Sequence, residues 1–311
     1  MWRIGDHIMI NIDKVPGEGI GAANAIPDLE VVEFWNKVLN EDLSGVITDS
    51  PYFLPNNNEI FIDKFDNYIK SSKLNKLVGL DEYKYRSFVH GSCQAFDSFW
   101  MRHNNKRFRC FKGEFFYHQA NWKKFYNWCY LEDVDMINTN DVVVISLPFS
   151  DYCKEHPKMK DMLDVCEELG VPVLIDCAYY VIARDINFDF TEYGCIEEIT
   201  FSLSKGFHSA TRLRAGVRYS KRHYDDNIDI MNEWNQYSHL SAYLGSKLLS
   251  YFPEDYVMNK FRDKQLKFCK ENNLIPSDCV PFAFGGEEYN QFNRGTEVNR
   301  ICISYLIGDK L

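Results

Sequence analysis

One stretch of the sequence, residues 200–220, combines a lysine with hydroxyl and guanidinium groups. It reads TFSLSKGFHSATRLRAGVRYS and contains Ser202, Ser204, Lys205, Arg212, Arg214 and Arg218. A lysine amine can form an imine with an aldehyde, above all when neighbouring cations lower its pKa. Hydroxyl groups and an arginine can together bind a phosphate dianion. In a chain of 311 residues with a net charge of -10, this concentration of positive charge predicts a local anion site.

Two more polar residues stand near the ends of strand-like segments. Ser92 follows the segment FVHG and occupies the position where the N-cap of a helix belongs. Asp176 ends the apolar run VPVLID, as Lys205 ends EEITFSLSK. Open α/β sheets bind ligands outside the carboxyl ends of their strands. We therefore expect Ser92, Asp176 and Lys205 to lie in one site.

The middle of the chain predicts a βαβ unit. DVVVISLPF at 141–149 and VPVLIDCAYY at 171–180 are apolar runs typical of strands buried on both faces. Between them, residues 156–170 carry apolar side chains at helical spacing and end at Gly170, a favourable residue for a helix end. Two parallel strands joined by a helix indicate a parallel sheet with a right-handed crossover.

Further elements follow from the same patterns. A third strand is expected over 197–205, with Ser202 and Ser204 on its hydroxyl face. Residues 211–220 read as another strand, whose period of two places Arg212, Arg214, Gly216 and Arg218 on one side. A helix is expected over residues 28–39, and the pattern is mostly helical after residue 221.

The set of groups matches the needs of one cofactor, pyridoxal 5'-phosphate (PLP). Its phosphate needs an anion site, its pyridine nitrogen needs a carboxylate, and its aldehyde needs a lysine. Two segments also resemble signatures of the fold-type I PLP enzymes, the aspartate aminotransferase superfamily. They are DCAYY at 176–180 and SLSKGF followed by RAG at 203–216, and the resemblance extends from Gly91 to Gly216 with a weaker match in VNRICISYL.

The resemblance implies a role for individual residues. Lys205 corresponds to the lysine that forms the Schiff base and moves the substrate proton, Asp176 to the partner of the ring nitrogen, and Tyr179 to the tyrosine that binds the phenolic oxygen. Arg300 corresponds to the arginine that binds the substrate α-carboxylate. The phosphate site would consist of Ser92, the backbone of Cys93, Ser202, Ser204 and Arg214, and the aromatic ring stacked on the pyridine would be Tyr117 or Phe116.

The sequence departs from the family pattern in two places. Leu147, before Pro148, stands where the family has an asparagine, and Ser146 and Ser150 are the candidates to replace it. The spacing from Lys205 to the arginine is one residue longer than usual. Both Arg212 and Arg214 are therefore candidates for the phosphate, and the Ala-Gly that follows favours Arg214. Arg294 would either favour an acidic substrate or lie at the surface.

The resemblance also implies an architecture. We expect an α/β fold with a mostly parallel seven-stranded sheet flanked by helices, and a small α+β C-terminal domain. The expected parts are an N-terminal segment packing with the small domain at 1–45, a PLP-binding large domain at 46–220 and the small domain at 221–311. Active sites shared between subunits in the family imply a homodimer.

The activity implied is an aminotransferase that acts on an amino acid with a free α-carboxylate and on a 2-oxo acid. Two alternatives stay open: a PLP-dependent lyase or decarboxylase of the same fold, and a degenerate member that acts as a binding or regulatory protein. Glycines 17, 19 and 21 are only a weak phosphate-loop signal and predict a flexible surface or active-site loop.

Composition excludes other classes. The acidic net charge disfavours nucleic acid and anionic membranes as partners. The ten cysteines form no CxxC pair and no zinc-type spacing, so we expect free thiols and no metal site. No run of about 18 apolar residues occurs, and we expect a cytoplasmic protein without a membrane partner.

Overall fold

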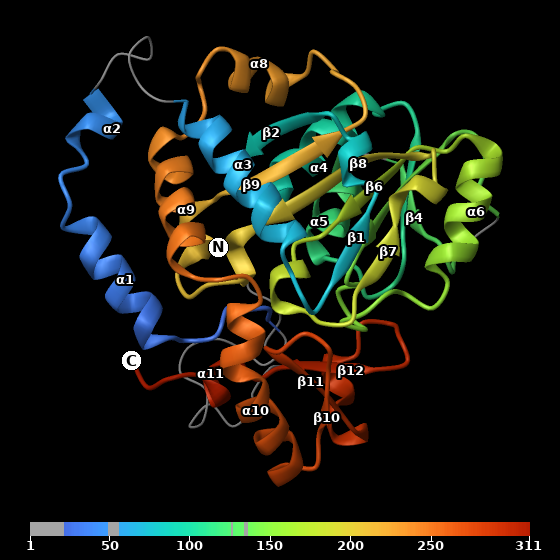
Figure 1. The fold of residues 1–311 in the computed structure, drawn as a ribbon. Coiled ribbons are helices and arrows are strands. Elements are labelled where there is room, and N and C mark those ends of the chain that lie inside the picture. Colours follow the sequence, from blue (N-terminus) through green and yellow to red (C-terminus); the bar gives the residue numbers. More distant parts are fainter. Residues whose placement is uncertain (1–21, 49–55, 126, 134–135) are drawn as a thin grey trace.

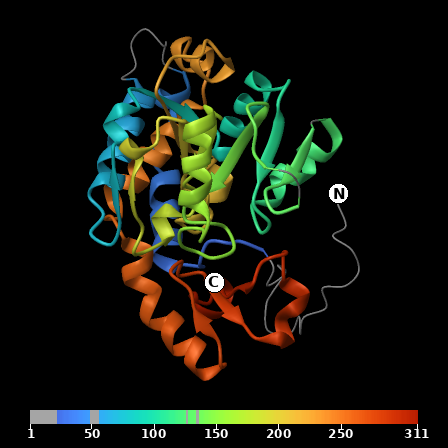
Figure 2. The same cartoon turned by 90° about the vertical axis from the view of Figure 1, so that its right-hand side faces the viewer.

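The computed structural model describes residues 22–48, 56–125, 127–133 and 136–311. Within these ranges, a seven-stranded sheet and a three-stranded sheet form the two parts of the fold. In Figures 1 and 2 the small sheet lies below the large one and packs beside the long helix α10 (Tyr256–Glu271). The loop expected around glycines 17, 19 and 21 lies outside the described residues.

The large sheet is mostly parallel, as expected. Its strand order is β2-β9-β8-β6-β5-β3-β4, and β9 alone runs antiparallel to both of its neighbours. The strands are β2 (Tyr85–Val89), β3 (Arg107–Cys110), β4 (Trp128–Tyr130), β5 (Asp141–Ser146), β6 (Val173–Asp176), β8 (Ile196–Ser202) and β9 (Gly216–Ser220). A short parallel pair, β1 (Lys76–Val78) with β7 (Asn187–Asp189), stands beside it.

Helices cover both faces of this sheet, which is why the valines and the isoleucine of β5 are buried on either side. Along β5, Val143 and Ile145 pack into the core of one face, and Val142 and Val144 into the core of the other. The first face carries α3 (Asn57–Lys70), α6 (Met159–Leu169) and α9 (His239–Tyr251), and the second carries α4 (Ser92–Arg102) and α5 (Phe116–Phe125). Helix α6 ends at Gly170, as its sequence predicts.

The small part gathers both ends of the described chain. Its sheet consists of β10 (Ile275–Pro276), β11 (Phe282–Gly285) and β12 (Asn299–Cys302), and α11 (Ser304–Ile307) follows. The expected N-terminal helix is α1 (Leu29–Leu39), and Asp28 caps it. Asp28 also accepts hydrogen bonds from Tyr256 and Lys260 of α10, at 3.0 and 2.7 Å. The segment before α1 is thereby tied to the small part.

Three other α-helices complete the fold. They are α2 (Ser44–Thr48), α7 (Ala210–Leu213) and α8 (Asn227–Glu233). Of the helices after residue 221, α8 and α9 pack on the large part. Helix α9 lies along α3, and α8 packs against β2 and α4. The domain boundaries expected at residues 45 and 220 remain a prediction. The contacts of α8 and α9 place residues 227–251 against the large part.

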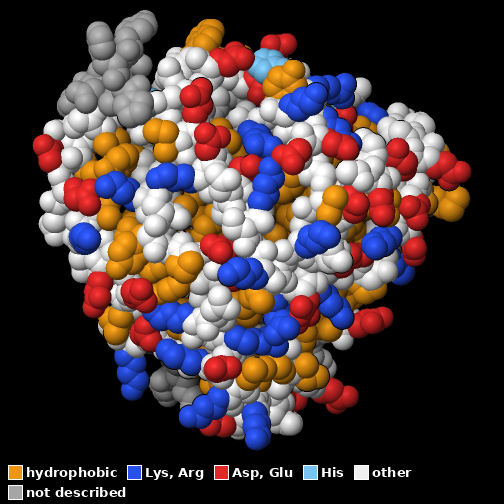
Figure 3. Space-filling view, viewed as in Figure 1, with side chains coloured by type: hydrophobic (Ala, Val, Ile, Leu, Met, Phe, Trp, Pro, Cys, Tyr) orange, Lys and Arg blue, Asp and Glu red, His pale blue; other side chains and the backbone are white. Residues whose placement is uncertain are grey.

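Charged side chains and free thiols bear on the expectations drawn from composition. On the face drawn in Figure 3, acidic and basic side chains are intermixed. All ten cysteines are free thiols. In the described ranges, no helix has the length and apolar character needed to cross a bilayer, and no group of side chains could hold a metal ion.

Candidate active site

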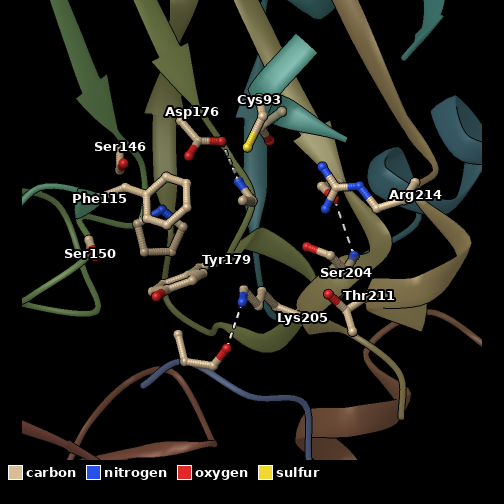
Figure 4. Close-up of a pocket in the computed structure, with 15 residues that line it drawn as sticks. Cys93, Phe115, Ser146, Ser150, Asp176, Tyr179, Ser204, Lys205, Thr211 and Arg214 are labelled. Carbon is tan, nitrogen blue, oxygen red and sulfur yellow. Dashed lines mark hydrogen bonds between the residues drawn. The ribbon is translucent and has the colours of Figure 1, made fainter. Parts of the chain in front are cut away.

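A pocket opens at the carboxyl ends of the parallel strands, where Ser146 ends β5, Asp176 ends β6 and Ser202 ends β8. It contains about 620 Å³ of space free of atoms, including its open mouth. Figure 4 shows its polar side chains pointing inward from several elements. The lining residues are Ala23, Ser92, Cys93, Phe115, Ser146, Pro148, Ser150, Asp176, Ala178, Tyr179, Ser202, Ser204, Lys205, Thr211 and Arg214.

Lys205 stands in the short 3-10 turn that follows β8 (Leu203–Lys205). Its Nζ donates a hydrogen bond of 2.6 Å to the carbonyl of Ala23, in the segment before α1 (Figure 4). Burial lowers the pKa of Lys205, which raises the fraction of neutral amine. A neutral amine facing a pocket is the form that attacks a carbonyl carbon.

Asp176 is 5% exposed, and its Oδ1 accepts a hydrogen bond of 3.1 Å from the backbone N–H of Ala178. Burial, with a further contribution from the nearby carboxyl of Glu114, raises the pKa of Asp176 to about 7. A carboxyl group with this pKa readily changes its charge near neutral pH. It is suited to pair with a cation that enters the pocket.

Opposite Asp176, hydroxyl groups and an arginine form an anion site. Helix α4 begins at Ser92, with Gly91 as its N-cap, so Ser92 is the first helical residue and not the cap that we expected. The Oγ of Ser92 is buried and lies beside the carboxyl group of Asp176. Ser202 Oγ accepts from the backbone N–H of Ser204 at 3.2 Å. The first turn of α4 also begins at this side of the pocket, where Ser92 and Cys93 line it, and helix N-termini favour anions.

Gly91 leaves the space that Arg214 occupies. Its φ is 82°, and a Cβ there would lie 3.0 Å from Arg214 Nη2 and 3.5 Å from Ser202 Oγ. Gly216 has a different role, since a Cβ on it would lie 2.2 Å from the carbonyl oxygen of Phe201 in the neighbouring strand. The first glycine admits the arginine to the pocket, and the second lets β9 pair closely with β8.

The strand expected over 211–220 is wrong in its first half. Residues 210–213 form α7, Arg214 follows in the left-handed conformation with φ 53°, and β9 begins only at Gly216. Helical residues rotate by about 100° each instead of alternating, so the three arginines do not share a face. Arg214 lines the pocket, and Arg212 is exposed outside it.

Arg218 lies in the interior, away from the pocket. It is fully buried in β9 and pairs with Asp226 and Asp229, which belong to the cap and first turn of α8. Its role is to attach α8 to the sheet.

Of the three aromatic residues at 115–117, Phe115 lines the pocket, one position before the residues that we expected. Phe116 is 65% exposed, and Tyr117 turns away to donate a hydrogen bond of 3.0 Å to Asp97. Helix α5 begins at Phe116, so each following side chain rotates around the helix axis and away from Phe115. The sequence motif GEFFYH contains all three aromatic residues. The position at which α5 begins decides which of them faces the pocket.

Tyr179 lines the pocket, and Arg300 lies behind it. Arg300 is 3% exposed, and its Nη1 donates to the hydroxyl of Tyr179 at 3.4 Å. Its Nε lies 3.7 Å from Asp151 Oδ1 and makes no hydrogen bond with the described residues. Arg300 itself is not among the lining residues. Asp151 binds Arg294 more closely, with a distance of 2.8 Å to its Nε, so Arg294 is a paired side chain and not a free surface group.

At the position of the family's asparagine, Leu147 is fully buried and does not line the pocket. Its neighbours Ser146 and Ser150 do line it. The hydroxyl of Ser146 already donates to Glu114, whereas that of Ser150 accepts from Arg294 at 3.3 Å. The sequence patterns did not indicate Phe115 and Ala23, which line the pocket, or Glu114, which lies behind it, because all three belong to irregular segments without periodicity. They also missed Thr211, which lines the pocket from α7 where a strand was expected.

Solved enzyme structures share this fold. The aromatic aminotransferase from Pyrococcus horikoshii OT3 is 14% identical, with 92% of this chain and 90% of that chain covered and a TM-score of 0.61. The PLP-bound C–S lyase from Staphylococcus hominis is 12% identical, with 95% and 87% covered and a TM-score of 0.61. The L-threonine-O-3-phosphate decarboxylase from Porphyromonas gingivalis is 12% identical, with 89% and 92% covered and a TM-score of 0.55.

The expected fold, that of the fold-type I PLP enzymes, is therefore confirmed. No protein-family model matches the sequence, and no curated protein matches it either. At these identities the likeness is one of fold, and it extends to enzymes named for three different reactions.

Proposed function

We propose that the pocket binds PLP and that the chain is a PLP-dependent aminotransferase. The observation that carries the proposal is that Lys205, Asp176 and the anion site around Arg214 line one pocket at the carboxyl ends of the strands. These groups come from separate elements of the chain. Their convergence supplies an amine, a carboxyl group and an anion site together, which is the set of groups that PLP requires.

The residues fit the cofactor in detail. Ser92 Oγ is buried at the pocket wall, and a phosphate oxygen would accept a hydrogen bond from it. Ser202, Ser204, Thr211 and Arg214 line the same side of the pocket, and hydroxyl and guanidinium groups are the usual donors to phosphate. The backbone of Cys93 lies in the first turn of α4 and would add an N–H group to this set.

PLP, when bound, supplies an aldehyde that combines with amines and a ring that withdraws electrons from the adjacent carbon. Lys205 would hold the aldehyde carbon through its amine and later take the proton from the substrate α-carbon. Asp176 would keep a proton on the ring nitrogen, and Tyr179 would donate a hydrogen bond to the ring oxygen. Phe115 would cover one face of the ring.

Arg300 would hold the substrate α-carboxylate. Its guanidinium group is buried, lacks a hydrogen bond at Nε, and lies next to Tyr179. A buried guanidinium group without full pairing is stabilised by an anion of suitable shape, and a carboxylate can bind it through two oxygens. This supports an amino acid with a free α-carboxylate as substrate and a 2-oxo acid as the second reactant.

The same residues serve a lyase or a decarboxylase, and enzymes named for such reactions share the fold. A degenerate binding protein is disfavoured because Lys205, buried and with a lowered pKa, has no evident role in a binding protein. We also propose a cytoplasmic homodimer, as the family resemblance implies, and sedimentation should give twice the mass of the chain.

The first experiment tests the cofactor. Purified protein that has been incubated with PLP and then freed of unbound PLP should keep an absorbance band between roughly 330 and 430 nm, and Lys205→Ala should lose the lysine-bound band. Lys73→Ala, at an exposed position distant from the pocket, is the matched control and should keep it. An unchanged spectrum in Lys205→Ala would rule out the proposed attachment.

The second experiment distinguishes the reactions. An aminotransferase should convert an amino acid to its 2-oxo acid and bring the cofactor to its aminated form without a second substrate. Release of carbon dioxide or of a side-chain fragment would instead identify a decarboxylase or a lyase. Arg300→Ala should lose the response to amino acids while still binding PLP, and Arg184→Ala, at a distant exposed ion pair, should retain both.

A further inference from the structure

A second buried carboxyl group, that of Glu114, lies behind the pocket wall. It stands two residues before α5 and is 2% exposed. Glu114 accepts hydrogen bonds from the backbone N–H groups of Phe115 and Ser146, both at 2.9 Å, and from the hydroxyl of Ser146. One side chain thus joins the aromatic wall residue to the end of β5.

The same contacts place Glu114 close to Asp176. Ser146 and Asp176 are register partners in the parallel strands β5 and β6, and the N–H of Leu147 donates to the carbonyl of Asp176 at 2.8 Å. Neighbouring strands lie about 4.8 Å apart, so a carboxyl group bound to Ser146 is a near neighbour of Asp176. Figure 4 shows Ser146, Phe115 and Asp176 along one wall of the pocket.

Few opposite charges compensate these two carboxyl groups. The charge of Lys205 lowers the pKa of Asp176 and that of Arg294 lowers the pKa of Glu114, but burial outweighs both and raises the pKa of each carboxyl. Arg294 is already paired with Asp151, and Lys205 donates to Ala23. Other titratable groups that face them are the buried thiols of Cys110 and Cys177, whose pKa is raised.

We propose that Glu114 is a positioning residue that holds Phe115 and the end of β5 in place and whose charge opposes ionisation of Asp176 in the empty pocket. Once a cation is bound opposite Asp176, the same negative charge helps to retain it. Retention of a bound cation rests on the proposed function, whereas the coupling between Glu114 and Asp176 in the empty pocket does not depend on it.

The test is a double-mutant cycle on the cofactor-free protein, with urea midpoints measured from pH 5 to pH 8. A carboxyl whose pKa is raised by folding binds more protons in the folded state than in the unfolded state. Stability is then lost as the pH rises from about 4 to about 7. We expect Glu114→Gln to reduce this pH-dependent loss roughly twofold, because it removes one ionising group and its repulsion of Asp176.

The coupling between Glu114 and Asp176 is measured by comparing the stability changes of the two single variants with that of the double variant. Because either single variant removes the repulsion, the effects of Glu114→Gln and Asp176→Asn should add to more than that of the double variant. Asp97→Asn, on a half-buried carboxyl of α4 whose pKa is also raised, is the control and should be additive with Glu114→Gln. Simple additivity of Glu114→Gln with Asp176→Asn would overturn the coupling.

A second measurement does not depend on folding of a Glu114 variant. In protein labelled with carbon-13 at glutamate carboxyl groups, Glu114 should titrate at a lower pH in Asp176→Asn than in the wild type. An unchanged titration would overturn the proposal. A PLP titration of the wild type, followed by absorbance, tests the proposed function separately, since its failure leaves the cofactor-free coupling unaffected.

With PLP bound, Glu114→Gln should lower the pH at which the cofactor spectrum changes, because less negative charge then favours the ring proton. A spectrum that changes at the same pH in both proteins would overturn the role of Glu114 in retaining the bound cation.

Discussion

Arg212 and Arg214 are two positions apart in the chain, yet only Arg214 lines the pocket. The left-handed conformation of Arg214 after α7 directs its side chain past Gly91, where no Cβ obstructs it. Both arginines are exposed, but Arg212, inside α7, is not among the residues that line the pocket. At the scale of the residue, backbone conformation thus decides which of two identical side chains can bind an anion.

A matched pair of variants tests this difference. Arg214→Ala should weaken PLP binding about 10- to 100-fold, the cost of removing a charged hydrogen-bond partner of a phosphate. Arg212→Ala should leave the affinity within about twofold. Absorbance titrations of both proteins measure the effect. Equal losses in the two variants would mean that the phosphate lies elsewhere.

At the scale of elements, a buried carboxylate joins the large part of the fold to the small one. Asp151, fully buried in the loop after β5, binds Arg294 Nε at 2.8 Å and Thr296 Oγ1 at 2.6 Å, both just before β12. Arg300 of β12 lies 3.7 Å from the same carboxylate. Two arginines of the small part therefore depend on one acid of the large part for their charge balance.

Removal of the Asp151 carboxylate should weaken the attachment of the small part to the large one and lower the stability of the protein. We expect Asp151→Ala to reduce the free energy of unfolding by about 3 kcal/mol, because it leaves a buried guanidinium group without its anion. Glu271→Ala breaks an exposed ion pair with Lys267 and should cost less than about 0.5 kcal/mol. Urea unfolding of both variants measures the difference, and similar midpoints would contradict a bridging role.

At the scale of the whole molecule, the pocket exists only in the folded chain. Its lining residues range from Ala23 to Arg214, and Lys205 is hydrogen-bonded to a residue 182 positions away. A ligand of this pocket binds the folded state alone and must stabilise the entire protein.

Thermal unfolding should therefore shift upward with PLP. At a free concentration 100 times the dissociation constant, the stabilisation is about 2.7 kcal/mol. Pyridoxal, which lacks the phosphate, should give a clearly smaller shift at the same concentration. An equal response to both compounds would indicate that the anion site is not used.

The sequence alone determined the parallel sheet, the βαβ unit, helix α1 and the gathering of Ser92, Asp176 and Lys205 at one edge. These follow from local periodicity and from the rule that parallel strands end at the same side of a sheet. Tertiary structure decided what periodicity does not encode. It placed Phe115 in the pocket instead of Phe116 or Tyr117, buried Arg218 against α8, turned Arg214 inward, and set Glu114 beside Asp176. These outcomes depend on where a helix begins, on one left-handed residue and on contacts between distant segments, and each is settled only when the chain packs.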